Sequence, residues 1–143
     1  MILKAITAEL HRFDGALNWN NPIRVRFEFQ DALPVRIKVA SDGETVIVDH
    51  APLEPPFDME EYGSIEHADA GKRIAANVIG ADVVLRPIAN PDGSRIGLAL
   101  VWEGEPVFCV LNMGDDLYWG DWKRFESWED VGPILPEAVV PGQ

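Results

Sequence analysis

Alternation of apolar and polar residues is the feature that most constrains the fold. Residues 23–30 read IRVRFEFQ and residues 35–39 read VRIKV, so apolar side chains occupy every second position in both segments. This period of two is typical of strands that bury one face. A third apolar run, at residues 45–48, follows the turn sequence SDG at 41–43. An antiparallel meander of three strands is therefore predicted.

The first two of these strands place basic residues on one face of the meander. If they pair as a hairpin, the polar side carries Arg24, Arg26, Arg36 and Lys38, four of the twelve Lys and Arg residues in the chain. Such a patch needs a counter-charge from solvent ions, an acidic loop or a ligand. A simpler interpretation is also open, because exposed strands often carry Arg and Lys that only prevent edge association.

A second antiparallel meander is predicted in the C-terminal half. The expected strands are residues 82–88, 95–102, 107–112 and 117–119. The turn sequence NPDG at 90–93 joins the first two. Residues 107–112, VFCVLN, are apolar on both faces, which indicates a central or sandwiched strand.

Helical segments are expected to be few. Asp121 is suited to the N-cap of a short amphipathic helix beginning at Trp122, and Gly132-Pro133 would end it. Residues 67–79 are ambiguous, since their alanines favour a helix while Gly71 weakens one. Residues 51–63, with three prolines and four acids, predict a covering loop with at most one helical turn.

Together these elements predict an α+β fold that is mainly β. Two antiparallel meanders form a sandwich or a strongly curved sheet, with one or two short helices that include a C-terminal one. Residues 1–143 have the size of one domain. Residues 133–143 contain proline and glycine and are expected to form an extended tail.

Composition limits the classes of function. The formal net charge of −12 repels phosphate backbones and anionic lipids, so basic proteins are expected as partners rather than nucleic acid or membrane. Lone Cys109 excludes an intrachain disulfide and favours a reducing compartment. The N-terminal residues lack the pattern of a secretory signal, and no segment approaches the roughly 18 apolar residues of a membrane helix. A cytoplasmic location is therefore expected.

Catalytic and metal-binding patterns are absent from the sequence, so we expect a non-enzymatic protein without a cofactor or a metal. His11, His50 and His67 are far apart in the chain, and no nucleophile motif accompanies them. Cys109 lies in the middle of an apolar strand, where a thiol is protonated and inert.

The acidic clusters have ordinary structural interpretations. Asp115 and Asp116 belong to an Asn-x-Gly-Asp-Asp sequence, which is typical of a turn held by hydrogen bonds from side chain to backbone. Asp58, Glu60 and Glu61 lack the alternate spacing of a calcium loop and are expected to form a solvated face.

Residues 107–130 crowd aromatic side chains among six acidic residues and two basic ones. Aromatic rings supply rigid contact area and carboxylates select a cationic partner, so this segment predicts a protein-binding surface. Its predicted contact residues are Asp115, Asp116, Tyr118, Trp119, Asp121, Trp122 and Glu126. Alternatively, the rings of Trp119, Trp122, Phe125 and Trp128 dock the terminal helix on the sheet, since large residues at helical spacing usually lie in a core.

Residues 97–116, GLALVWEGEPVFCVLNMGDD, together with DMEEYG at 58–63, resemble small bacterial domains that include immunity proteins of polymorphic toxin systems. The resemblance implies a protein that neutralises a toxin by binding and covering it. An acidic chain suits a basic toxin. Two other classes stay open: a β domain that binds a small molecule or cation between its sheet and residues 52–63, and an enzyme of unrecognised class.

Overall fold

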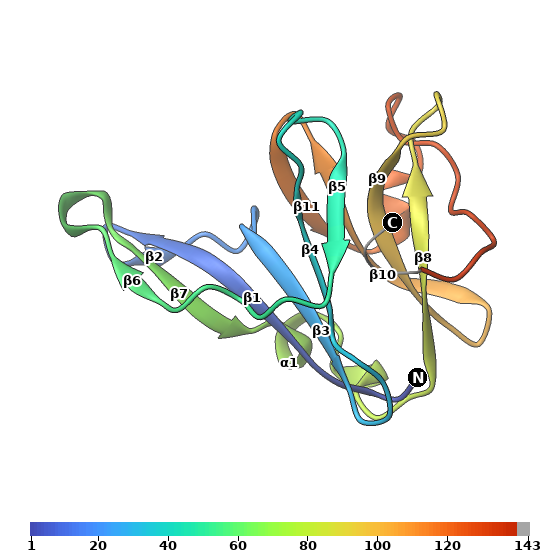
Figure 1. Ribbon diagram of the computed structural model, residues 1–143, viewed down its shortest axis with the longest axis horizontal. Helices are drawn as coiled ribbons and strands as arrows, with labels where there is room; N and C mark the ends of the chain where they lie inside the picture. The colour runs from blue at the N-terminus through green and yellow to red at the C-terminus, as the bar shows by residue number, and fades with distance from the viewer. Residues whose placement is uncertain (140–143) are drawn as a thin grey trace.

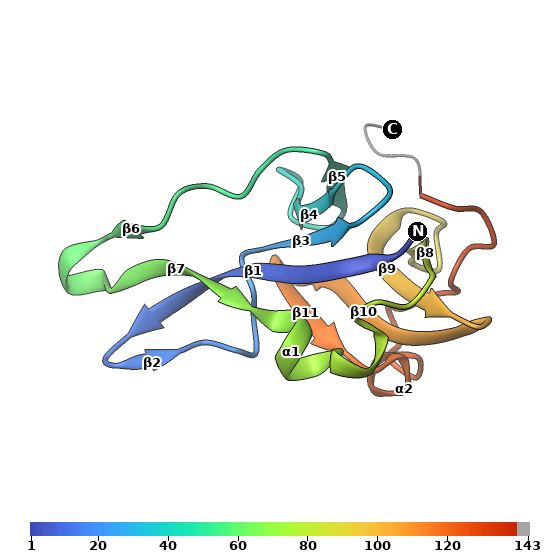
Figure 2. The same ribbon diagram turned by 90° about the horizontal axis from the view of Figure 1, so that it is seen from below.

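The computed structural model describes residues 1–139, which form two antiparallel sheets packed against each other (Figures 1 and 2). The first sheet contains β1 Leu3–Phe13, β2 Ala16–Leu17, β3 Arg24–Phe29, β4 Val35–Val39, β5 Val46–Asp49, β6 Phe57–Asp58 and β7 Ser64–Asp69. The second contains β8 Val83–Ala89, β9 Arg95–Trp102, β10 Glu105–Met113 and β11 Asp116–Gly120. The helical elements are α1 Ala70–Ile74, α2 Trp122–Phe125 and the 3₁₀ turns η1 Glu60–Tyr62 and η2 Ala76–Val78. The predicted α+β, mainly β fold is confirmed.

The first sheet has the strand order β5-β4-β3-β1-β7-β6, with β2 paired to β1. The predicted meander of β3, β4 and β5 is confirmed, but β1, which no sequence pattern indicated, is the strand that joins this meander to β7. Its core-facing residues are Leu3, Ile6, Ala8 and Leu10. A shift in register between Leu3 and Ala5 interrupts the alternation of β1, and its alanines weaken the strand signal.

Residues 67–79 contain both elements that the sequence left open. Strand β7 continues to Asp69, whose side chain then caps α1 by accepting a hydrogen bond from the Lys72 backbone N–H at 3.2 Å. Helix α1 ends after five residues and η2 follows it. A side chain at Gly71 would crowd the Ile79 methyl group and the Ile6 backbone, so the glycine permits this turn to lie against β1.

The second sheet is a meander with the order β11-β10-β9-β8. Its central strand β10 is buried on both faces, as its continuous apolar sequence predicts. Phe108 and Val110 face the first sheet, whereas Cys109 and Leu111 face the C-terminal segment that includes Phe125. The two sides of the second sheet therefore each contribute to a separate apolar cluster.

The C-terminal segment differs from its prediction in length. Helix α2 has only four residues, and the Asp121 side chain makes no capping hydrogen bond at its start. Single turns then lead to Gly132, whose backbone N–H donates to the Ala89 carbonyl at 2.8 Å. Residues 134–139 run beside β8, with hydrogen bonds from Leu135 N–H and Val139 N–H to β8 carbonyls. The rest of the predicted tail, 140–143, lies outside the described residues.

One part of the first sheet extends beyond the second sheet as an arm, visible in both views (Figures 1 and 2). We define the arm as residues 11–17 and 57–66. The C-terminal end of β1 pairs there with β2 and with β7, and β7 pairs with the short edge strand β6.

Phe108→Ala tests the core between the sheets. The Phe108 ring is buried, and its centroid lies 6.2 Å from the ring centroids of both Phe27 and Trp119. Truncation leaves a cavity there, so we expect the free energy of unfolding in urea to fall by about 3–5 kcal/mol. In the control variant Leu33→Ala, at an exposed turn, we expect a change below about 0.5 kcal/mol. Equal losses in the two variants would contradict this packing.

Candidate functional site

Trp119 is not available to a partner, contrary to the sequence prediction. Its side chain is 4% exposed and lies between the two sheets, because Trp119 shares the inward face of β11 with Leu117. The indole N–H donates to the Trp19 carbonyl at 2.6 Å, and the two indole rings stack with centroids 6.2 Å apart. This indole belongs to the core of the fold.

The remaining rings of the cluster surround Phe125 on the outer face of the second sheet. Phe125 is fully buried, while Tyr118, Trp122 and Trp128 are half-buried. The Trp128 ring meets Phe125 edge-on at 5.0 Å and Tyr118 edge-on at 5.7 Å. The contact of Trp128 with Tyr118 on β11 and the burial of Phe125 attach the C-terminal segment to the sheet. Packing therefore accounts for most of the aromatic cluster, as the alternative interpretation predicts.

Three of the predicted contact residues, Asp121, Trp122 and Glu126, do come together. They line an open groove of about 500 Å³ on the side of the molecule where α1 and α2 both lie (Figure 2). The other lining residues are Ile74, Asn77, Glu105, Pro106, Val107 and Lys123. Apolar side chains from two other segments, α1 and the start of β10, thus meet beside Trp122, together with three carboxylates and one ammonium group.

Asp115 and Asp116 line a different depression, of about 270 Å³, together with Arg24 and Lys38. Asp115 is in the left-handed region at φ +76°, and a side chain at Gly43 would collide with its carboxylate. The turn between β10 and β11 therefore touches the turn between β4 and β5. The seven predicted residues do not share one surface, and the turn interpretation of Asp115 agrees with this geometry.

The same contact between turns involves Asn112, which is 2% exposed. Its side-chain N–H groups donate to the Gly43 carbonyl at 3.1 Å and the Thr45 carbonyl at 3.0 Å. These bonds satisfy two backbone acceptors of the first sheet with a side chain from the second. Asn112 therefore has a structural role in joining the sheets.

The basic face of the first sheet is confirmed by its register, in which Arg24 lies opposite Lys38 and Arg26 opposite Arg36. Its counter-charges come mainly from the same sheet. Fully buried Glu9 accepts from Arg24 at 2.9 Å, Glu28 accepts from Arg26 at 2.6 Å, and Asp49 accepts from Arg36 in a bidentate pair at 2.9 and 2.7 Å. An external anion is not needed to balance these three guanidinium groups.

Of the covering loop predicted at residues 51–63, residues 51–56 cover this face, whereas Phe57–Asp58 form β6 and Glu60–Tyr62 form the one helical turn, η1, in the arm. Arg36 donates to the Pro52 carbonyl at 3.2 Å, and the Glu54 backbone N–H approaches the Glu9 carboxylate at 3.4 Å. The His67 ring donates to the Glu54 carbonyl at 2.6 Å. Glu9 was missed by the sequence analysis because its strand was missed.

The Asp49 carboxylate is stabilised in its charged form. Its hydrogen bonds from Arg36 lower the pKa of Asp49, outweighing the effect of burial, and the same pair raises the pKa of Arg36.

Asp49→Asn tests this ion pair through the pH dependence of stability. A folded-state pKa below the ordinary value of 3.8 means that Asp49 contributes stability at higher pH and loses it as pH falls through the folded pKa. We expect the variant to be less stable at neutral pH and to lose less stability than the wild type below pH 3.8. The matched change Asp92→Asn, at an exposed carboxylate with no ion pair within residues 1–139, is expected to change the free energy of unfolding at neutral pH by less than about 0.5 kcal/mol. If the free energy of unfolding falls equally steeply below pH 3.8 in Asp49→Asn and in the wild type, this assignment is wrong.

Potential catalytic groups are engaged in the fold. His11, His50 and His67 each donate a ring N–H to a backbone carbonyl. Cys109 is fully buried, and burial together with the charge of Asp121 raises the pKa of the thiol to about 12. Within residues 1–139, no three His, Cys, Asp or Glu side chains are grouped to hold a metal ion.

Thiol labelling tests the state of Cys109. A buried thiol with a pKa of about 12 has very little thiolate at neutral pH, so we expect no reaction with iodoacetamide in the native protein and complete reaction in denaturant. Mass spectrometry measures the added group. Rapid native labelling would show that Cys109 is accessible and activated.

Comparison of the chain with protein-family models, characterised proteins and solved structures finds no significant match. The resemblance to immunity proteins therefore stays a prediction. Across the described residues, every helix is too short or too polar to cross a membrane.

The arm carries aromatic residues that the sequence analysis did not select. Phe13, Phe57 and Tyr62 are exposed there, beside Asp58, Glu60 and Glu61, which were expected to form a solvated face. Each of these rings belongs to a residue directly next to an acid in the sequence: FD at 13–14, FD at 57–58 and EY at 61–62. That repeated pairing was the available signal.

Proposed function

We propose that this chain is a non-enzymatic, acidic binding protein for a basic protein, most specifically an immunity protein that covers a basic toxin. The groove beside Trp122 carries the proposal. It combines an apolar lining with the carboxylates of Glu105, Asp121 and Glu126 against the single ammonium group of Lys123. Aromatic residues in partly desolvated grooves often dominate the binding energy of an interface.

Charge supports the same class of partner. The net charge of −12 increases the rate of encounter with a cationic protein, and the carboxylates at the rim of the groove add local complementarity. On the basic face formed by β3 and β4, three of the four Arg and Lys residues are paired internally, which leaves little there to attract nucleic acid or an anionic membrane. We propose that binding takes place in the cytoplasm.

A small-molecule or cation-binding domain has less support. The place predicted for such a ligand, between the first sheet and residues 52–63, is occupied by direct contacts from Pro52 and Glu54 to the side chains of the sheet. An enzyme has less support again, because the histidines and Cys109 are used in the fold.

Trp122→Ala tests the groove. The partner is sought as the basic protein encoded by a neighbouring gene, co-purified with the tagged chain and measured by calorimetry. We expect Trp122→Ala to weaken binding by about 2 kcal/mol or more, because a half-buried indole supplies the largest apolar contact in the groove. Asp121→Asn combined with Glu126→Gln is expected to slow association and to reduce its dependence on salt.

Two controls separate local from general effects. Leu33→Ala removes an exposed apolar side chain at a distant turn, and Asp92→Asn with Glu129→Gln removes the same number of charges away from the groove. Neither control is expected to weaken binding or to slow association as much as the groove variants do. If the affinity changes neither with salt concentration nor in Trp122→Ala, the groove is not the binding surface.

A further inference from the structure

We infer that the end of the arm is a second protein-binding surface, which takes an arginine-rich segment of a partner protein. The surface consists of Phe13, Phe57 and Tyr62 with the carboxylates of Asp14, Asp58, Glu60 and Glu61. It lies on different elements from the Trp122 groove and does not depend on it.

Exposure of the rings is the first observation. Phe13 is 55% exposed, Phe57 52% and Tyr62 68%, and within residues 1–139 these are the three exposed side chains among Phe, Tyr and Trp. All three are on the arm. Every Trp and every other Phe of the described chain is at least half-buried. Exposed apolar side chains gathered at one place mark an interaction site more often than single ones scattered over a surface.

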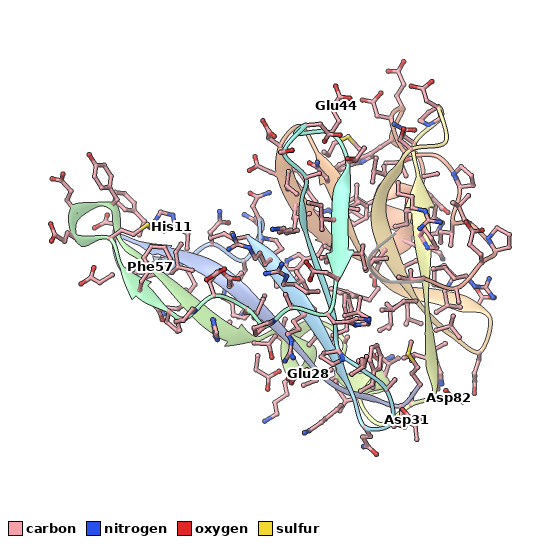
Figure 3. All side chains as sticks on the ribbon, in the orientation of Figure 1. His11, Glu28, Asp31, Glu44, Phe57 and Asp82 are labelled. Carbon is pink, nitrogen blue, oxygen red and sulfur yellow. The ribbon has the colours of Figure 1, made fainter. Side chains whose placement is uncertain are left out.

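The register of the arm brings these residues to the same end of the molecule. His11 on β1 lies opposite Ile65 on β7, and Ile65 lies opposite Phe57 on β6, so the three side chains form a row across the arm. Figure 3 shows His11 and Phe57 together at this end. The Phe13 ring stacks on His11 with centroids 6.0 Å apart, and the His11 ring donates to the Tyr62 carbonyl at 2.6 Å.

The loop that presents Tyr62 is held in one shape. Met59 N–H donates to the Gly63 carbonyl at 2.7 Å, Gly63 N–H donates to Glu60 at 3.1 Å, and the Asp58 carboxylate accepts from the Glu60 N–H at 2.8 Å. Gly63 is at φ +92°, and any side chain there would collide with the Arg12 carbonyl. A loop fixed in this way loses little conformational freedom on binding.

The negative charge of the arm determines which kind of partner it attracts. Asp14, Asp58, Glu60 and Glu61 have no ion-pair partner within residues 1–139, while the arm's one arginine, Arg12, is paired to Glu66. A cationic segment would neutralise these carboxylates, whereas a second copy of this chain would bring four more. Nucleic acid and anionic lipid are repelled in the same way.

Arginine fits this surface better than lysine. A guanidinium group pairs with carboxylates through two parallel hydrogen bonds and stacks on aromatic faces. The protein contains this second contact internally, where the Arg73 guanidinium carbon lies 4.1 Å from the centroid of the Trp19 ring. Aromatic rings next to carboxylates therefore offer both contacts at once.

The test uses the isotope-labelled full chain and a short polyarginine peptide, with a polylysine peptide of equal length for comparison. We expect backbone amide signals of residues 11–14 and 57–63 to shift most, and polyarginine to bind more tightly. Phe57→Ala with Tyr62→Ala is expected to weaken polyarginine binding by about tenfold and to remove the preference over polylysine. Asp58→Asn, Glu60→Gln and Glu61→Gln together are expected to weaken both peptides and to flatten the salt dependence.

Matched controls remove equivalent groups elsewhere. Leu33→Ala deletes an apolar side chain that is 66% exposed, and Asp92→Asn, Glu103→Gln and Glu129→Gln together remove the same number of charges from other turns. Both should bind polyarginine as the wild type does. The dispersion of amide signals verifies that each variant is folded.

Three results would overturn the inference. Shifts spread evenly over all acidic residues would indicate unspecific attraction, and shifts centred on Trp122 would assign the peptide to the groove. Self-association of the free chain that is lost in Phe57→Ala with Tyr62→Ala would make a second copy the occupant. None of these results contradicts the proposed function, which Trp122→Ala tests separately with the partner protein.

Discussion

Burial of β10 on both faces is the constraint on which the rest of the structure depends. One face, with Phe108 and Val110, closes the core between the sheets, and the other, with Cys109 and Leu111, holds the C-terminal segment. A strand without a polar face cannot be exposed on either side. The chain therefore needs the first sheet on one side and the segment around Phe125 on the other, which is why aromatic residues concentrate beside this strand.

Much of the fold was predictable because strand alternation is a local property. The meander of β3 to β5 and the strands of the second sheet follow their apolar patterns closely. The burial of Trp119 could also have been predicted from the sequence. Leu117 and Trp119 are two positions apart in a strand, so their side chains must face the same side of the sheet. Strand β1 could not be predicted in this way, because its irregular register breaks the alternation and its alanines suit a helix equally well.

The candidate sites depend on contacts between distant segments, which local patterns do not contain. The groove beside Trp122 needs α1 and the start of β10, and Trp122 was found while its apolar neighbours were not. The charges of the basic face were correctly placed, but Glu9, the partner of Arg24, lies in the missed strand. The aromatic residues of the arm come from positions 13, 57 and 62, and only the pairing of strands makes them neighbours.

The segment at residues 134–139 gives β8 a neighbour that the sheet itself does not provide. Strand β8 is the last strand in the order of the second sheet, and carbonyls of Leu85 and Pro87 are occupied by N–H groups of this segment. An uncovered outer strand is a template on which further chains can polymerise. The segment thus protects the outer edge of β8, and displacing it would leave these carbonyl groups free to pair with another chain.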